Sequence, residues 1–327
     1  MENESRPASW KILFAFSMIY FVWGSTFLAI RVGVHEVPPF LLAAMRFFTA
    51  GLVMYAWLRL RGTPAPSRRE WIAAAALGGL IFVVDYGCLF WAEQRVPSGI
   101  AAVVLATIPV FITLMEITFL RTQRLTVRLA LALLVGLCGV AVLMNHSFSL
   151  GEVPINRAGA VALLVAAVTW SIATIFTRRL PLPASKPMSA AAQMLTGGAQ
   201  LFVLTAVAGE FRGFRVQAVS WNAWFALVYL IIAGSIVGFT AYVWLLHWES
   251  PTKVGTYAYV NPVVAVALGY FLGGEAVGPR TLLGTVLVLV SVVAITTTKK
   301  SKDLPLSSAP GDLMESTCGS DTHVRRL

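Results

Sequence analysis

Charge is scarce in this chain. Only 12% of its 327 residues are Asp, Glu, Lys or Arg, while 57% are hydrophobic. A soluble domain carries about 25% charged residues, so this sequence has too few polar side chains to cover a water-soluble protein. The apolar residues also run in blocks of about 20, the length that crosses a bilayer as a helix. Short alternating runs are rare, which argues against a membrane β-barrel.

Motifs for catalysis and for coupling to ATP are missing as well. The sequence has no GxxxxGK[ST] phosphate loop and no HExxH metal motif, and its four histidines are scattered. Its three cysteines, Cys88, Cys138 and Cys318, have the spacing of neither a disulfide framework nor a metal site. We therefore expect no enzyme activity, no metal and no cofactor. A membrane-embedded lipid enzyme is a much less favoured alternative, because no nucleophile, metal site or acid–base pair gathers near a helix end, and a non-transporting assembly scaffold is weaker still.

The net charge of +10 does not indicate nucleic-acid binding. The basic residues stand at the ends of apolar blocks, where Lys and Arg set membrane topology. None of them forms a cluster interleaved with exposed aromatic residues. The expected partners are a lipid bilayer and a small-molecule substrate, and we expect no nucleic acid.

The apolar blocks predict an all-α membrane protein with ten transmembrane helices. The predicted helices cover residues 12–34, 40–58, 71–91, 98–120, 127–144, 158–176, 191–208, 222–246, 254–272 and 280–298. Residues 1–11 form a segment before the first helix. Residues 299–327 are polar and rich in Ser, Pro and Gly, so we expect a disordered tail.

The positions of the basic residues predict the orientation. With the N-terminus in the cytoplasm, 18 of the 25 Lys and Arg residues fall on the inside, six fall on the outside, and Arg46 lies within a helix. Cytoplasmic loops carry such an excess of positive charge. We therefore expect both termini in the cytoplasm and a multi-pass protein of the bacterial inner membrane.

Two stretches of the chain look alike, residues 97–143 and 250–295. Each begins near a Ser/Pro pair, enters an apolar helix with a central proline, and turns into a second apolar helix. Five helices per half is an odd number, so repeats over residues 12–144 and 158–298 must be inverted relative to each other. Inverted repeats are typical of secondary transporters. A chance likeness between apolar helices is the other interpretation.

The two central prolines, Pro109 and Pro262, are expected to break their helices. Proline lacks an N–H group and clashes with the carbonyl four residues earlier. A backbone group freed in the membrane must be satisfied by protein or water. Paired breaks therefore point to the binding site of a repeat transporter. The alternative is a simple kink in each helix.

Several polar and aromatic residues fall in the middle of predicted helices. Tyr257 and Asn261 lie four residues apart and share a helix face. That face suits a cavity for a small amphipathic solute, or hydrogen bonding between helices. Trp23 and Trp170 lie mid-helix at corresponding places in the two halves. They either line a cavity or pack in the core.

Three charged residues are embedded in predicted helices: Arg46, Asp85 and Glu116. Each costs about 2.5–3.5 kcal/mol at a helix centre, so each needs a partner or water. Arg46 and Asp85 fall at similar depths, which predicts an ion pair or a shared polar network. Glu116 falls near the cytoplasmic face, as a solvated carboxylate or as a site for a proton or an amine. Proton coupling through Asp85 or Glu116 is therefore one hypothesis.

Short motifs occur along the chain in a characteristic order. They are Trp23-Gly24-Ser25-Thr26 with Arg31, Pro38-Pro39, Ala44-Met45-Arg46-Phe47, the stretch from Val96 to Pro109, the stretch from Tyr257 to Pro262, and Gly273-Gly274-Glu275. In these motifs the chain resembles EamA-type members of the drug/metabolite transporter superfamily, most of all the YedA-type bacterial inner-membrane subgroup. The resemblance covers about residues 12–297. It implies ten helices in two inverted five-helix repeats and transport by alternating access.

The resemblance also implies a function and a site. Such proteins mostly export small metabolites, amino acids or toxic compounds through a central cavity lined by both halves. The cavity candidates in this chain are Trp23, Tyr86, Tyr257, Tyr259 and Asn261. The family often has Gly-Glu in the turn after the fourth helix, where this chain has Gln123, so a role for matched carboxylates is in doubt. Uptake is the alternative direction, and a homodimer is one option for assembly.

Overall fold

The computed structural model describes residues 7–119, 125–144, 156–177, 179–249, 254–255 and 257–296. Within these ranges every regular element is a helix, which confirms the predicted all-α class. The tail at 299–327 and the turn that contains Gln123 lie outside the described residues.

Among the described residues, seven helical stretches are long and apolar enough to cross a membrane. Three of them are single helices: α3 (Pro39–Leu60), α9 (Arg157–Thr177) and α10 (Lys186–Val207). Another contains α6 (Ser98–Leu105) and α7 (Ile108–Thr118). The other three have three parts each: Ser9–Val34 (α1 Ser9–Ser17, η1 Met18–Val22, α2 Trp23–Val34), Arg68–Glu93 (α4 Arg68–Gly78, η2 Gly79–Tyr86, α5 Gly87–Glu93) and Trp221–Trp248 (α11 Trp221–Tyr229, η5 Leu230–Phe239, α12 Thr240–Trp248). Three further helices carry shorter apolar segments: α8 (Val127–Met144), α14 (Tyr257–Phe271) and α15 (Pro279–Thr296). A single 3₁₀ turn, η4 (Val216–Ala218), precedes α11.

The observed helix ends follow local chemistry. Pro39 opens α3 at a first-turn position, where its missing N–H has no helical partner anyway. Ser185 caps α10 by accepting from the Met188 N–H, so this helix begins five residues before the predicted Ala191. The first helix begins at Ser9, three residues before the predicted boundary.

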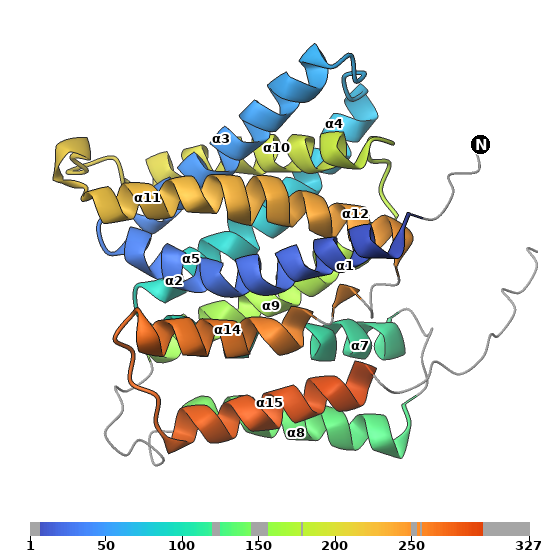
Figure 1. Cartoon of the computed structure of the whole chain (residues 1–327), viewed down its shortest axis with the longest axis vertical. Coiled ribbons are helices and arrows are strands. Elements are labelled where there is room, and N and C mark those ends of the chain that lie inside the picture. Colours follow the sequence, from blue (N-terminus) through green and yellow to red (C-terminus); the bar gives the residue numbers. More distant parts are fainter. Residues whose placement is uncertain are drawn as a thin grey trace, which may run out of the picture.

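The helices run roughly side by side across the molecule (Figure 1). Helix α3 packs along α10 at one edge, and α8 packs along α15 at the opposite edge. Small residues allow the first of these contacts. A Cβ at Gly51 of α3 would collide with the Leu195 backbone nitrogen, and one at Gly198 of α10 would collide with the Phe48 nitrogen. Such small-residue contacts bring helix backbones close together in membranes.

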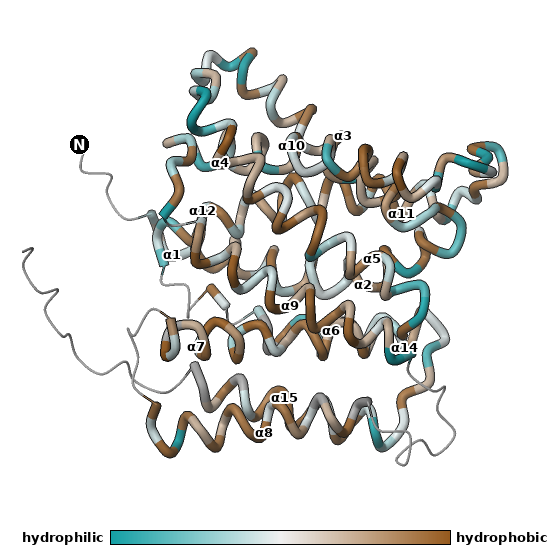
Figure 2. The backbone as a smooth tube through the Cα atoms, turned by 180° about the vertical axis from the view of Figure 1, so that it is seen from behind, coloured by the Kyte–Doolittle hydropathy of each residue, from teal (hydrophilic) through white to brown (hydrophobic). Residues whose placement is uncertain are grey.

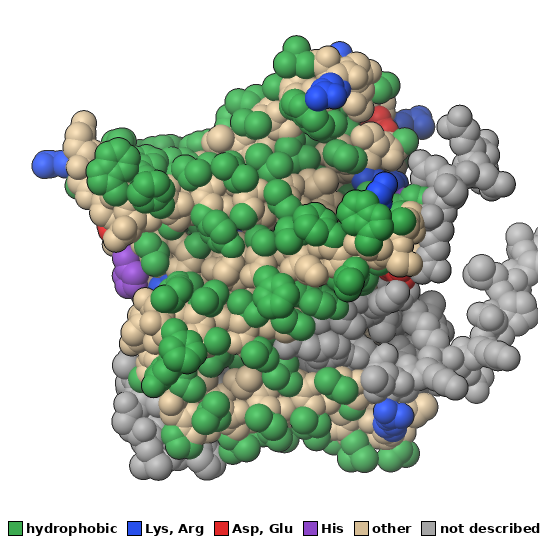
Figure 3. All heavy atoms as spheres, viewed as in Figure 1, with side chains coloured by type: hydrophobic (Ala, Val, Ile, Leu, Met, Phe, Trp, Pro, Cys, Tyr) green, Lys and Arg blue, Asp and Glu red, His purple; other side chains and the backbone are tan. Residues whose placement is uncertain are grey.

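The distribution of polarity fits a membrane protein. Brown, hydrophobic backbone dominates the helices in Figure 2, and teal segments gather where helices end. Hydrophobic side chains cover much of the face shown in Figure 3, with Lys and Arg towards its left, right and upper margins. The exposed fractions of Phe225, Phe21 and Val203 are 68%, 60% and 65%. A face of this kind is stable against lipid chains rather than water.

Three of the long stretches contain a π-helical segment near their middle: η1, η2 and η5. A π-helical turn is rare, and it occurs often at functional sites. In this fold the segments lie around one region, since η1 contacts η5, and the Phe82 ring of η2 lies 5.4 Å from the Phe239 ring of η5. That region contains the candidate site.

Candidate functional site

A cavity of about 60 Å³ lies between helices from both halves of the chain. One water molecule needs about 10–15 Å³ by this measure, so the cavity holds a few waters in this conformation. Its lining residues are Trp23, Thr26, Phe27, Asp85, Tyr86, Leu89, Ala102, Leu105, Ala106, Ile108, Trp170, Tyr257, Asn261 and Pro262. The structure thus brings together four of the five predicted cavity residues, along with Asp85 and Pro262. That a substrate binds there stays a prediction.

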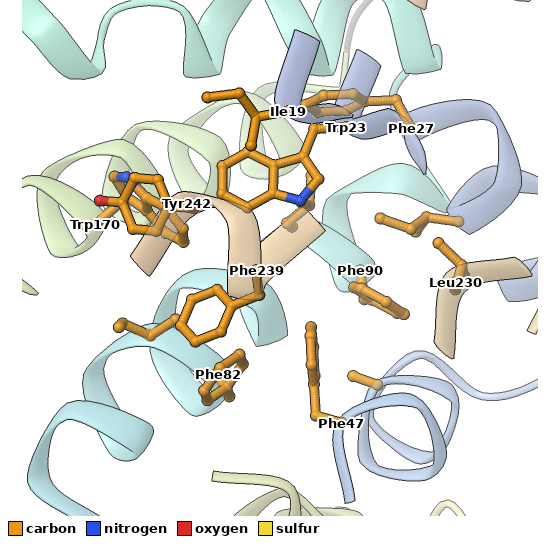
Figure 4. Packing of buried hydrophobic residues seen from close by; sticks show 14 of the residues in the cluster. Ile19, Trp23, Phe27, Phe47, Phe82, Phe90, Trp170, Leu230, Phe239 and Tyr242 are labelled. Carbon is orange, nitrogen blue, oxygen red and sulfur yellow. The ribbon is translucent and has the colours of Figure 1, made fainter. Parts of the chain in front are cut away.

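Aromatic rings form much of the wall, with Trp23 of α2 at their centre. Its ring centroid lies 5.8 Å from that of Trp170 and 5.3 Å from that of Tyr257, with both pairs near 85°. Tyr242 of α12 lies 5.2 Å from Trp23 on another side. Edge-to-face pairs at these separations are favourable. In Figure 4 the rings of Trp23, Trp170 and Tyr242 gather from three different helices. The two mid-helix tryptophans therefore meet, as a cavity-lining pair would.

Trp23 is fixed in place by the π-helical segment η5. Its indole N–H donates to the carbonyl of Gly234 at 3.0 Å. Gly238 leaves room for the indole, because a Cβ there would lie 2.5 Å from the Trp23 Nε1. A buried indole N–H needs such an acceptor. The orientation of Trp23 therefore depends on a helix of the other half.

Asn261 connects α14 to η1. With its amide nitrogen towards η1, it donates to the carbonyls of Tyr20 at 2.9 Å and Ile19 at 3.2 Å. The hydrogen-bonding pattern assigns this orientation, since in the opposite one the amide oxygen would point at carbonyl oxygens and could accept no hydrogen bond from them. A π-helical turn shifts its carbonyls out of the usual α-helical pattern, and the amide satisfies two of them. Asn261 therefore has a structural role as well as a place on the cavity wall.

Arg46 and Asp85 do not form the predicted ion pair. The Arg46 Nε donates to the Ser235 hydroxyl at 2.8 Å, and its guanidinium lies over the rings of Phe47, Tyr86 and Phe90. Asp85 has no ion pair or hydrogen bond with any residue that the structure describes. Equal depth in the membrane is not enough for contact, because the direction of each side chain depends on how its helix is rotated.

The two prolines have different surroundings. Helix α6 ends at Leu105, two turn residues follow, and Pro109 stands in the first turn of α7. Pro262 lies inside α14, which continues past it. Of these two prolines, Pro262 lines the cavity and Pro109 does not. Two predicted residues, Tyr259 and Glu116, lie on helices, but their side chains are outside the described part of the structure.

Sequence reasoning missed a buried acidic network at the start of α6. Glu275 accepts from the N–H and hydroxyl of Ser98 at 2.8 and 2.6 Å and from the Gly99 N–H at 3.1 Å. Its carboxylate also lies 3.3 Å from the Arg31 Nε. Glu93 is fully buried nearby, and within the described part of the chain neither of its carboxylate oxygens has a hydrogen-bond partner. The Gly-Glu motif at 274–275 was the available signal, but sequence alone did not link it to a helix that starts 177 residues earlier.

Two more carboxylates cap helix N-termini across the chain. Glu36 accepts from the Ser220 N–H at 2.5 Å and from its hydroxyl at 2.7 Å, and these bonds lower the pKa of Glu36. Glu210 accepts from the Leu41 N–H at 2.8 Å at the start of α3. Burial raises the pKa of Glu210, and its backbone hydrogen bonds oppose that shift. Anions are favourable at helix N-termini, so each contact links two segments distant in sequence.

Comparison with known proteins agrees with this picture. The sequence profile described as the EamA-like transporter family matches residues 9–145 and 157–297. A protein of Escherichia coli strain K12 named "Uncharacterized inner membrane transporter YedA" is 37% identical over 281 residues, covering 85% of this chain and 88% of that protein. A Bacillus subtilis protein named "Uncharacterized transporter YoaV" is 23% identical over 288 residues, covering 86% and 95%.

A solved crystal structure is similar with a TM-score of 0.62 and 24% sequence identity, covering 91% of this chain and all of the other. At that identity the likeness supports the fold alone. The named relatives confirm the inner-membrane location predicted from the sequence, while the orientation of the termini stays a prediction. The family match covers both halves and confirms the resemblance seen in the motifs, so this chain is a membrane transporter that belongs to the EamA-like transporter family.

Proposed function

We propose that this chain is a secondary active transporter that exports small metabolites, amino acids or toxic compounds by alternating access. The observation that carries the proposal is the cavity, whose walls come from both halves: Trp23 and Tyr86 from the first, Trp170 and Tyr257 from the second. A site between halves can face one side of the membrane and then the other when the halves move relative to each other. Proton coupling, through Asp85 or through Glu116, is part of the proposal.

The architecture that goes with this mechanism is ten spans in two inverted five-helix repeats, residues 12–144 and 158–298. The packing supports it, because corresponding helices of the halves pair: α3 with α10, α6 with α14, and α8 with α15. The third long helix of each half also carries a π-helical segment near its middle, η2 in one and η5 in the other. Pairing of this kind is expected for repeats related by a two-fold axis.

The orientation has both termini in the cytoplasm, supported by the excess of Lys and Arg in the segments assigned to that side. Then the N-termini of α3, α6 and α11, with their capping carboxylates Glu210, Glu275 and Glu36, face the outside. The substrate is a small molecule, and the protein works as a single chain or as a homodimer.

Growth of an export-deficient bacterial host tests the function. The host overexpresses the wild type or a variant and is challenged with a panel of amino acids, toxic analogues and drugs. Trp23→Ala and Asn261→Ala remove two cavity residues, and Trp221→Ala makes the same change at a tryptophan that is 77% exposed. All proteins are compared at equal membrane abundance.

Protection against one chemical class, lost in the cavity variants and kept in the Trp221 variant, is the expected result. Heightened sensitivity to a compound, again dependent on Trp23, would reverse the direction to uptake. Equal growth of the wild type, the variants and the empty host across the panel would count against transport through this cavity.

A further inference from the structure

Among the described residues that line the cavity, Asp85 carries the one acidic group, and none is Lys, Arg or His. Asp85 is only 3% exposed. Within the described residues it accepts no hydrogen bond and forms no ion pair. A carboxyl group buried in this way either takes up a proton or needs a positive charge beside it to stay ionised. None of the described lining side chains is positively charged, so a cation that keeps Asp85 ionised has to come with a ligand.

The other embedded charge of this region, Arg46, is already engaged elsewhere. Its Nε bonds to Ser235 at 2.8 Å, and its guanidinium lies 5.2 Å from the centre of the Tyr86 ring. Arg46 is not on the cavity wall, whereas Tyr86 is. Arg46 therefore stands behind the wall and does not neutralise Asp85.

The remaining walls suit a cation with an organic body. Trp23, Tyr86, Trp170 and Tyr257 all line the space, and neighbouring rings meet at steep angles of 76° to 85°. These four residues give the lining a large aromatic surface. Aromatic faces attract ammonium groups, and cages of Trp and Tyr bind methylated amines. Apolar neighbours such as Leu89 and Ile108 accommodate a hydrocarbon part.

We propose that the substrates of this cavity are small organic amines, with the protonated amino group on the Asp85 carboxylate and the hydrocarbon part among the Trp and Tyr rings. This inference rests on the proposed transport function and specifies its substrate class. It assigns to Asp85 the anchoring of the cationic group. Neutral and anionic solutes of the same shape lack the charge that the site requires, so they bind less well.

Three probes with one carbon skeleton test the charge requirement. They are 2-phenylethylamine, which is a cation at pH 7, 2-phenylethanol, which is neutral, and phenylacetate, which is an anion. Binding to the purified full-length protein in detergent is measured by calorimetry and by the fluorescence of the cavity tryptophans. The variants are Asp85→Asn, which keeps the shape of the side chain, and Glu70→Gln, which removes a carboxylate in the exposed cap of α4.

The expected result is that the amine binds the wild type at least tenfold more tightly than the alcohol or the acid. Asp85→Asn weakens amine binding at least tenfold and leaves the alcohol unchanged, while Glu70→Gln changes neither. Three outcomes overturn the inference: equal or tighter binding of the alcohol or the acid, amine binding unaffected by Asp85→Asn, or no binding of the amine.

The growth panel separates this inference from the proposed function. Export of a neutral or anionic class that requires Trp23 and persists in Asp85→Asn would leave the transport function standing and remove the amine class. A panel in which no solute depends on the protein would remove the function itself.

Discussion

Replacing Glu275 by Ala is expected to destabilise the protein by about 2–4 kcal/mol. The Glu275 side chain is 6% exposed, and it accepts three hydrogen bonds at the N-terminus of α6 in addition to its ion pair with Arg31. Loss of a helix cap costs about 0.5–2 kcal/mol, and a hydrogen bond to a charged group contributes about 1.5–3 kcal/mol. The Arg31 side chain is 25% exposed, so water can solvate its charge once Glu275 is gone. The expected loss of stability is therefore smaller than the sum of the lost cap and hydrogen bonds.

The assay is the midpoint of thermal unfolding of the purified protein in mild detergent. A loss of this size lowers the midpoint by about 5–10 °C in a chain of a few hundred residues. Glu275→Gln keeps an oxygen acceptor without the charge, so about half of the loss is expected. Glu70→Ala, at the exposed cap of α4, is the control and should lower the midpoint by less than half as much. A midpoint for Glu275→Ala within 1–2 °C of the wild type, by the same scale, would refute the importance of this network.

Three further predictions follow from single contacts. Gly198→Ala puts a Cβ against the Phe48 backbone and should cost about 1–3 kcal/mol, seen as a lower unfolding midpoint; an unchanged midpoint would contradict the close α3–α10 packing. Glu36→Gln should lower the stability of the protein at pH 7. The difference in stability from the wild type should shrink as the pH falls below 4.5, because the hydrogen bonds that lower the pKa of Glu36 stabilise the fold only while its carboxylate is ionised. A difference in stability that stays constant with pH would disprove this role. Trp23→Phe keeps the ring but loses the hydrogen bond to η5, and should reduce efflux at unchanged abundance; full activity would show that the indole N–H is dispensable.

Much of the fold could be predicted because burial in lipid imposes a simple rule on the sequence. Every span needs a long apolar block, and the observed helices α8 and α9 lie within one residue of the predicted ranges at both ends. The π-helical segments could not be predicted. A π turn depends on what packs against it, as where Gly234 leaves room for Arg46.

The cavity was predictable to the extent that its residues are unusual in the middle of a span. A tryptophan, a tyrosine or an amide at mid-membrane calls for an explanation, and Trp23, Tyr257 and Asn261 do meet at one cavity. The hydrogen-bond partners of these buried residues were less predictable. Counting residues gives the depth of Arg46 but not the direction of its side chain, and Ser235, its actual partner, lies 189 residues away.

Accessibility of the cavity from the two sides of the membrane tests alternating access most directly. A protein with its native cysteines replaced carries Ala106→Cys on the cavity wall, or Ala167→Cys in the packed core as a control. A membrane-impermeant thiol reagent is applied to right-side-out and to inside-out vesicles. Our account predicts that position 106 reacts from both sides and that a transported solute slows the reaction, while position 167 does not react. Reaction of position 106 from one side only, or from neither, would contradict alternating access through this cavity.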